Sequence, residues 1–436
     1  MSTSDGPPLI NIKRTDADIK EAVNLWYTNH AEAEALYGNI SEWDVSSVTD
    51  MSNLFKKIVY HEFNENISKW DVSNVTNMQG MFSGARAFNQ PIGSWNVSNV
   101  TNMETMFGGT RAFNQPIGSW NVSNVTNMNR MFIGAWTFNQ PIEEWDVSNV
   151  TNMEEMFSSA KAFNQPIGSW IVSNVTNMKR MFYEAHKFNQ PIGTWNVSNV
   201  INMHSMFFDA QEFNQDIGGW DVSSVTNMRA MLCGTDSFNQ PIGAWNVSNV
   251  VDMGGIFSSA QAFNQPIGSW NVSKVTDMGS MFRAAYVFNQ PIGAWNVSNV
   301  TKMSSMFSGA HAFNQPIGSW NVSKVTRMDW MFNDAYKFDQ PIGDWDVSNV
   351  TDMAWMFDGA RSFNQDLTRW NVTDNIPTFS RCPMSNENKP AMFRGGGGAK
   401  KTRRARRRAS RRRSQKGRRS RKGRRTRRTR SNIITY

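Results

Sequence analysis

The sequence predicts an α/β repeat solenoid in which each coil of 25 residues holds one short strand and one short helix. The first observation behind this class is composition: the 436 residues include 18 Trp, 28 Phe and 27 Met, so a few residue types recur very often. The second is spacing, because one Trp recurs every 25 residues from Trp70 to Trp370. The third is that two apolar periodicities alternate within each repeat. A fixed period of this length is typical of solenoids, whose repeats bury their apolar residues against one another.

The repeat begins at Trp43, and only its first spacing differs, since 27 residues separate Trp43 from Trp70. The two additional residues lie between Phe55 and Phe63. The chain therefore contains 13 repeats and a terminal half, and we assign residues 43–376 to the solenoid.

Each repeat opens with a pattern typical of a short strand. Ile92, Trp95 and Val97 have the spacing of the strand in a leucine-rich-repeat-like coil. Apolar residues then recur in steps of three or four, which indicates one face of a short helix: Val100, Met103, Met106, Phe107, Thr110 and Phe113. A Pro follows and ends the helix, because it lacks an N–H group. We expect stacked coils to bury the Trp, Phe and Met residues as continuous columns.

The chain on the N-terminal side of the repeats predicts a cap. We expect disorder in residues 1–14 and a helical N-terminal cap in residues 15–42, with a single amphipathic helix from Thr15 to Leu36. Its apolar face consists of Ile19, Ala22, Val23 and Trp26. Such a helix would cover the open end of the first coil.

The chain on the C-terminal side divides into two segments. Residues 377–394 contain three Pro and no full repeat, which predicts an irregular C-terminal cap. Residues 395–436 begin with four Gly that form a hinge and continue as an Arg-rich tail. We expect the tail to be disordered, because it has no apolar residue larger than Ala before Ile433.

The net charge of +9 divides into an acidic body and a basic tail. Residues 399–430 hold 16 Arg and 4 Lys, and the first 398 residues hold 25 basic and 36 acidic side chains, a net charge of −11. The excess of Arg predicts binding to nucleic acid or another polyanion, since a guanidinium pairs with two phosphate oxygens at once. The expected polyanion-binding residues are Arg403, Arg404, Arg406, Arg407, Arg408, Arg411, Arg412, Arg413, Arg418, Arg419, Arg424, Arg425, Arg427 and Arg428.

Three other interpretations of the tail stay open. A nuclear or nucleolar address signal would use the same residues. An anionic membrane would also attract them, and a solvated tail would need no partner. No aromatic residue is interleaved with the arginines, so we expect binding that depends strongly on salt and little on sequence.

The repeat, which reads FNQPIGSWNVSNVTNMxxMF, resembles the bacterial surface protein repeat of the BspA-like and mycoplasma lipoprotein families, also found in protists and large DNA viruses. The resemblance covers roughly residues 37–375. It implies a leucine-rich-repeat-like fold and, for the bacterial members, adhesion at the cell surface. It implies no catalytic residues.

A comparison of the repeats with one another predicts where a partner would bind. The outward positions of the expected strand barely vary, so we expect that Asn and Ser ladder to be structural. Variation is concentrated on the expected helix side, where large aromatic residues occupy equivalent places near the C-terminal end. Clustered aromatic side chains are typical anchors of protein interfaces, although packing between coils would also explain them. The residues of this hypothetical protein-binding patch are Trp330, Trp355, Tyr286, His311 and Tyr336.

We identify no catalytic, cofactor-binding or metal-ligating residues, because the five His and two Cys have no metal-binding spacing and no nucleophile motif interrupts the repeat. No leader peptide is evident and no run of about 18 apolar residues occurs, so we expect an intracellular protein, and a nuclear or virion-associated one would fit. The sequence favours a non-enzymatic scaffold that binds a protein through its solenoid and a polyanion through its tail. The alternative is an adhesin-like surface protein with a cationic anchoring tail.

Overall fold

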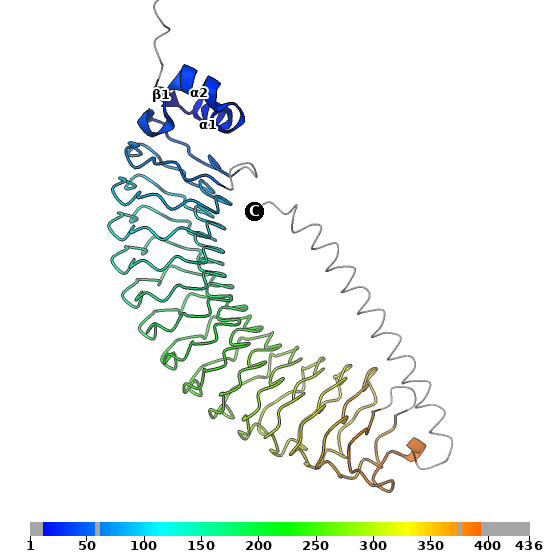
Figure 1. The fold of residues 1–436 in the computed structure, drawn as a ribbon. Helices are drawn as coiled ribbons and strands as arrows, with labels where there is room; N and C mark the ends of the chain where they lie inside the picture. Colours follow the sequence, from blue (N-terminus) through cyan, green and yellow to red (C-terminus); the bar gives the residue numbers. More distant parts are fainter. Residues whose placement is uncertain (1–11, 57–61, 373–376, 394–436) are drawn as a thin grey trace, which may run out of the picture. The chain divides into compact units, whose positions relative to one another are not determined.

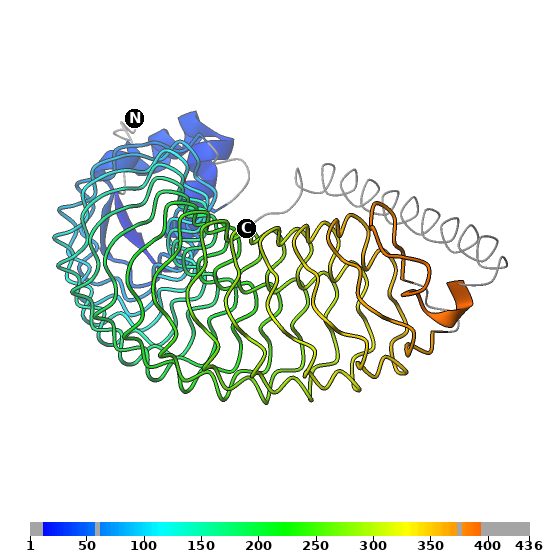
Figure 2. The ribbon, with the colours of Figure 1, turned by 90° about the horizontal axis from the view of Figure 1, so that it is seen from below.

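The computed structural model describes residues 12–56, 62–372 and 377–393, and it divides them into two compact units between Asn199 and Val200. Each unit is a stack of coils whose successive turns lie side by side (Figures 1 and 2). The prediction of a repeat solenoid is therefore confirmed. The Arg-rich tail and its expected polyanion-binding residues lie outside the described ranges.

A small cap precedes the first coil of unit one. It contains the strand β1 (Lys13–Thr15), the helices α1 (Ile19–Thr28) and α2 (His30–Tyr37), the 3-10 helix η1 (Ile40–Glu42) and the strand β2 (Asp44–Ser47). Strands β1 and β2 pair in parallel. The expected apolar face of the helix is confirmed, because Ile19, Ala22, Val23 and Trp26 are all buried in α1.

Two details of the predicted cap are wrong. The single helix is broken at Asn29, which leaves the helical conformation at φ −151° and accepts a hydrogen bond from the Glu32 N–H group as the N-cap of α2. Residues Lys13 and Arg14, expected to be disordered, belong to β1. Arg14 is fully buried and forms an ion pair of 2.8 Å with Asp18, and this pairing lets a charged side chain enter the cap.

The coils from residue 48 to residue 372 contain neither the predicted strand nor the predicted helix; their described residues form turns and isolated parallel bridges such as Asn102↔Asn127. A helix would need every N–H group to bond four residues back. Here alternate groups bond to the next coil instead, as Phe82 does to the Met106 carbonyl at 2.9 Å. The N–H groups between them bond three residues back, as Met81 does to Met78 at 3.2 Å. The apolar steps of three therefore reflect a series of turns.

Stacked aromatic columns fill the interior, as the sequence predicts. Phe107 and Phe132 stack with ring centroids 5.5 Å apart and planes inclined by 5°. The buried Trp side chains also bond to the preceding coil, as the Nε1–H group of Trp120 does to the Ile92 carbonyl at 3.1 Å. The Trp, Phe and Met side chains of this kind are almost fully excluded from solvent. The core prediction is confirmed.

A polar ladder joins the coils at the segment that precedes each Pro. The N–H group of Asn114 donates to Oδ1 of Asn89 at 2.9 Å, and Nε2 of Gln115 donates to the Asn89 carbonyl at 3.0 Å. The expected Asn and Ser ladder is structural as well, because Oδ1 of Asn96 accepts from the Ser98 N–H group within its own coil at 3.1 Å.

The C-terminal cap is more regular than predicted, because it reproduces the contacts of a further coil. Ser385 donates its N–H group to Oδ1 of Asn364 at 2.8 Å, as the ladder Asn does in a full repeat. Phe379 stacks on Phe357 at 5.5 Å, as the next repeat's Phe would. The described chain then ends in the 3-10 helix η3 (Ala391–Phe393).

Candidate interaction surface

Each full coil carries two backbone positions with positive φ. We call the first of them the left-handed column, and its φ values lie between 53° and 67°. Residues with a Cβ atom adopt this conformation at a cost of roughly 1–2 kcal/mol, and Gly adopts it freely. The column consists of Asn53, Gly80, Thr105, Arg130, Glu155 and Arg180 in unit one, and of Ser205, Ala230, Gly255, Ser280, Ser305, Trp330 and Trp355 in unit two.

Two of the predicted site residues, Trp330 and Trp355, occupy the last two places of this column. Their φ values are 63° and 64°, which is an uncommon conformation for so bulky a residue. The rings stack on each other with centroids 5.3 Å apart and an interplanar angle of 19°. Both side chains are partly exposed. They therefore lie outside the core and pack partly against each other on adjacent coils, and each keeps part of its surface open to a partner.

The three other predicted residues form a second stack on successive coils of unit two. The His311 ring lies 4.7 Å from Tyr286 and 4.2 Å from Tyr336, nearly parallel to both. The guanidinium of Arg361 continues the stack, with its carbon 4.2 Å from the centre of the Tyr336 ring. A cation over an aromatic face is an attractive contact that also holds the ring in place.

The pKa of His311 is lowered in this stack, which favours the neutral imidazole. Burial is the largest cause that lowers the pKa of His311, and the nearby Arg361 charge lowers it further, against the opposing effect of Asp334. Asp334 in turn lies 3.5 Å from the guanidinium of Arg381, a residue of the C-terminal cap. A neutral imidazole stacks between two phenol rings without the need to neutralise a charge.

The structure thus assembles the predicted residues into two stacks. Within the described ranges no ring contact joins the Trp330–Trp355 pair to the Tyr286–His311–Tyr336 stack. Arg361 was not predicted to be in the site, although it lies at the same repeat position as Tyr336 and a comparison of coils would have found it. Arg381 lies outside the repeat, so the sequence held no signal for it.

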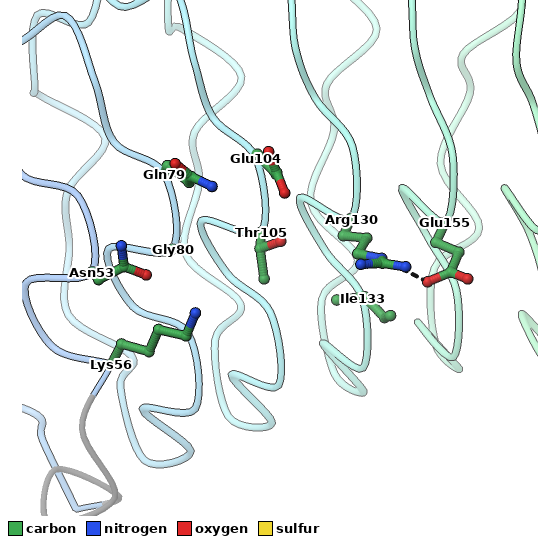
Figure 3. A pocket seen from close by; sticks show the side chains of 9 residues that line it. All are labelled: Asn53, Lys56, Gln79, Gly80, Glu104, Thr105, Arg130, Ile133 and Glu155. Atoms are coloured by element: carbon green, nitrogen blue, oxygen red, sulfur yellow. Dashed lines mark hydrogen bonds and ion pairs between the residues drawn. The ribbon is translucent and has the colours of Figure 1, made fainter. Parts of the chain in front are cut away.

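Unit one has a depression on its own part of the left-handed column (Figure 3). Its volume is about 330 Å³, and Arg130 bonds across it to Glu155, with Nε and Oε2 2.8 Å apart. The lining holds two cationic side chains, Lys56 and Arg130, and two anionic ones, Glu104 and Glu155, so the charges are matched in number. The lining residues are Asn53, Lys56, Gln79, Gly80, Glu104, Thr105, Arg130, Ile133 and Glu155.

Other chemistry is limited in the part of the chain that is described. No group of three or more His, Cys, Asp or Glu residues there is placed to hold a metal ion. None of the helices there is long and apolar enough to cross a bilayer. Burial raises the pKa of both Cys233 and Cys382, so neither thiol ionises readily at neutral pH.

Comparison with known proteins adds a family. Residues 24–135, 113–220, 206–310 and 288–389 each match the family model described as "Mycoplasma protein of unknown function, DUF285". No curated protein matches the chain. Among solved structures, one titled "Crystal structure of TLR13-ssRNA13 complex" is 8% identical over 73% of this chain and 69% of that one, with a TM-score of 0.18. A likeness at that TM-score carries no argument about fold or function.

Proposed function

The chain belongs to the family described as Mycoplasma protein of unknown function, DUF285, and we propose that this member is a non-enzymatic scaffold that binds a partner protein through Trp330 and Trp355. The Tyr286–His311–Tyr336 stack would form a second part of the contact. The Arg-rich tail would bind nucleic acid or another polyanion. The proposed location is inside the cell that makes the protein, which fractionation of that cell tests.

One observation carries the protein-binding proposal. The same backbone position holds Gly255, Ser280 and Ser305 on other coils of unit two, so the fold does not require an aromatic residue there. Two successive Trp residues nevertheless accept a left-handed conformation and remain partly exposed. Most other members of the column share this backbone conformation, so the exposed aromatic side chain is what distinguishes these two coils, and such side chains are typical anchors of interfaces.

The test replaces both Trp residues by the residue that the fold itself uses at this position. Peptides are selected from a displayed library on the full-length chain, and their affinities are measured for the parent and for the Trp330→Gly/Trp355→Gly variant. Because interface anchors contribute 2 kcal/mol or more, we expect the variant to bind at least about tenfold more weakly. Thermal unfolding should be little changed, since Gly255 already has this conformation.

The matched control is Ser280→Gly/Ser305→Gly, which makes the same change of backbone at two earlier coils of the column. The control should bind the selected peptides as the parent does. If the Trp variant also binds them as the parent does, the proposed site is wrong.

The tail is tested by deletion. The affinity of the full-length chain and of residues 1–394 for a single-stranded oligonucleotide is measured at several salt concentrations. We expect the full-length chain to bind at least about 100-fold more tightly at low salt and to lose that advantage steeply as salt rises, because bound counterions are released from the nucleic acid. Equal affinities for the two chains would remove the polyanion proposal.

A further inference from the structure

A second surface of unit one is positively charged, although the first 398 residues together carry a net negative charge. It consists of Arg86, Arg111, Trp136 and Lys161, which occupy one repeat position on four successive coils. We call it the basic ridge. All four side chains are exposed, and Trp136 retains 39% of its accessible surface. The body that carries the ridge has 36 acidic and 25 basic side chains in its first 398 residues.

The cations of the basic ridge lack acidic partners, unlike other cations of unit one. Arg130 and Arg180 both pair with Glu155, and Lys179 lies 2.7 Å from Glu154. Among the described residues, no carboxylate lies within ion-pair distance of Arg86, Arg111 or Lys161. The ridge therefore presents uncompensated charge that an anionic ligand would neutralise.

Trp136 is held rigidly inside the ridge. The guanidinium of Arg111 lies 4.0 Å from its ring centre on one coil, and Nζ of Lys161 lies 5.0 Å away on the other. Both cations are thus oriented by the ring before any ligand arrives, which reduces the entropy lost on binding. Since cations contact the ring, its exposed edge is the part offered to a ligand.

Two backbone carbonyls of the ridge already accept hydrogen bonds from the next coil. The N–H group of Ala112 donates to the Arg86 carbonyl at 3.0 Å, and that of Ala162 donates to the Trp136 carbonyl at 3.2 Å. These two carbonyls are not open to a ligand, so we expect an anionic ligand to bind chiefly through the side chains of the ridge. The flanking Ala residues leave room for it next to the long cationic side chains.

The spacing of the ridge identifies the shape of that ligand. Two residues further along each coil, the Phe88, Phe113 and Phe138 rings repeat at 5.8 and 6.0 Å. Alternate side chains of an extended peptide repeat at about 6.7 Å on one face, and flexible Arg and Lys side chains absorb the difference over three coils. Base stacking on an open aromatic face, which single-stranded nucleic acids use, is hindered because cations contact the Trp136 ring.

From these observations we propose that the basic ridge binds an extended acidic segment of a partner protein, with carboxylates on alternate residues. The carboxylates contact Arg86, Arg111 and Lys161. This surface lies in unit one and is independent of the Trp330–Trp355 site, so either proposal can fail without the other.

The test uses the full-length chain and an alternating Glu-Thr decapeptide. A carbodiimide activates the Glu carboxylates of the peptide, and each bound peptide then forms an amide bond with the nearest Lys amine of the chain. Mass spectrometry then separates adducts at Lys161 from adducts at the tail residues Lys400 and Lys416. The variant Arg86→Gln/Arg111→Gln keeps Lys161 itself and removes the neighbouring charges. We expect its Lys161 adduct to fall at least about fivefold while the tail adducts are unchanged, because each exposed ion pair contributes modestly.

Two controls sharpen this result. The variant Lys274→Gln/Arg369→Gln makes the same change of net charge in unit two and should leave the Lys161 adduct unaltered. A peptide of five Glu followed by five Thr should give at least about threefold less adduct at Lys161. The proposal is overturned if the ridge variant keeps its Lys161 adduct or if both peptides react equally at Lys161. It is also overturned if an oligonucleotide, added in excess over the tail, suppresses the Lys161 adduct at a lower concentration than a non-coupling competitor peptide does.

Discussion

The polar ladder makes a quantitative prediction at Asn114. In the next coil, the Asn139 N–H group donates to Oδ1 of Asn114 at 2.9 Å, and Nε2 of Gln140 contacts the same oxygen at 3.1 Å. The change Asn114→Ala removes this acceptor. Gln140 keeps its second bond, to the Asn114 carbonyl at 3.0 Å, but the Asn139 N–H group loses its only acceptor in this ladder.

The magnitude follows from the burial of that donor. A fully buried donor without a partner costs about 1–3 kcal/mol, and the partial burial of Asn139 lets water recover some of this. We therefore expect a loss of about 1–2 kcal/mol in the free energy of unfolding. For a unit of this size that lowers the melting temperature by roughly 2–8 °C.

The chain supplies its own control, because Asp339 takes the place of the ladder Asn in a later coil and accepts from the Asn364 N–H group at 2.9 Å. Asn114→Asp keeps an acceptor oxygen and should unfold near the parent temperature at pH 7. Calorimetry gives the melting temperatures, and hydrogen exchange at the Asn139 amide gives the local effect. Equal melting temperatures for Asn114→Ala and the parent, or equal losses for the Ala and Asp variants, would refute the role of the ladder oxygen.

Three further changes test the cap and the coil stack. Burial raises the pKa of Asp16, but hydrogen bonds from Thr49 and from the Asp50 amide outweigh burial and lower the pKa overall. The ionised Asp16 therefore stabilises the cap fully above the ordinary carboxyl pKa, and this stabilisation is lost as pH falls through the lowered value. Exchange of the Thr49 amide should therefore accelerate in that acidic range, and Asp16→Asn should remove the pH dependence. A Cβ atom on Gly93 would collide with the Pro116 carbonyl of the next coil, so Gly93→Ala should cost about 1–3 kcal/mol in denaturant unfolding, and an unchanged midpoint would contradict this. Phe132→Ala should cost about 3–5 kcal/mol, and a loss below 1 kcal/mol would show that its column is loosely packed.

The sequence contained enough to predict the coil stack and its core, but not the conformation inside a coil. Val100, Met103 and Met106 recur in steps of three, which suits both a helical face and a series of turns. The difference depends on whether an N–H group bonds within its coil or to the next one, and periodicity holds no information about that choice. The left-handed positions were hidden for a related reason, because Trp330 and Arg130 are not residues from which positive φ is expected.

The candidate patch was located correctly on successive coils because equivalent residues of a stack become neighbours in space. Tyr286, His311 and Tyr336 are 25 residues apart in the sequence and lie in ring contact. Arg381 could not be found in this way, because the cap that carries it has no counterpart in the repeat. Whether the patch binds a protein stays a prediction.

The two caps bear on how a chain of this kind changes its length. Asp16 accepts hydrogen bonds from Thr49 and Asp50 where an earlier coil would supply a carbonyl, and Ser385 donates to Asn364 as a later coil would. Both caps thus recognise features that every coil shares. Loss of a segment such as residues 96–120 would join Trp95 to Asn121, and its duplication would join Trp120 to Asn96, in both cases in frame and with both ends closed. Unequal recombination can then add or remove whole coils without the need for a new cap at either end. The residues of the left-handed column and of the basic ridge can meanwhile diverge one coil at a time.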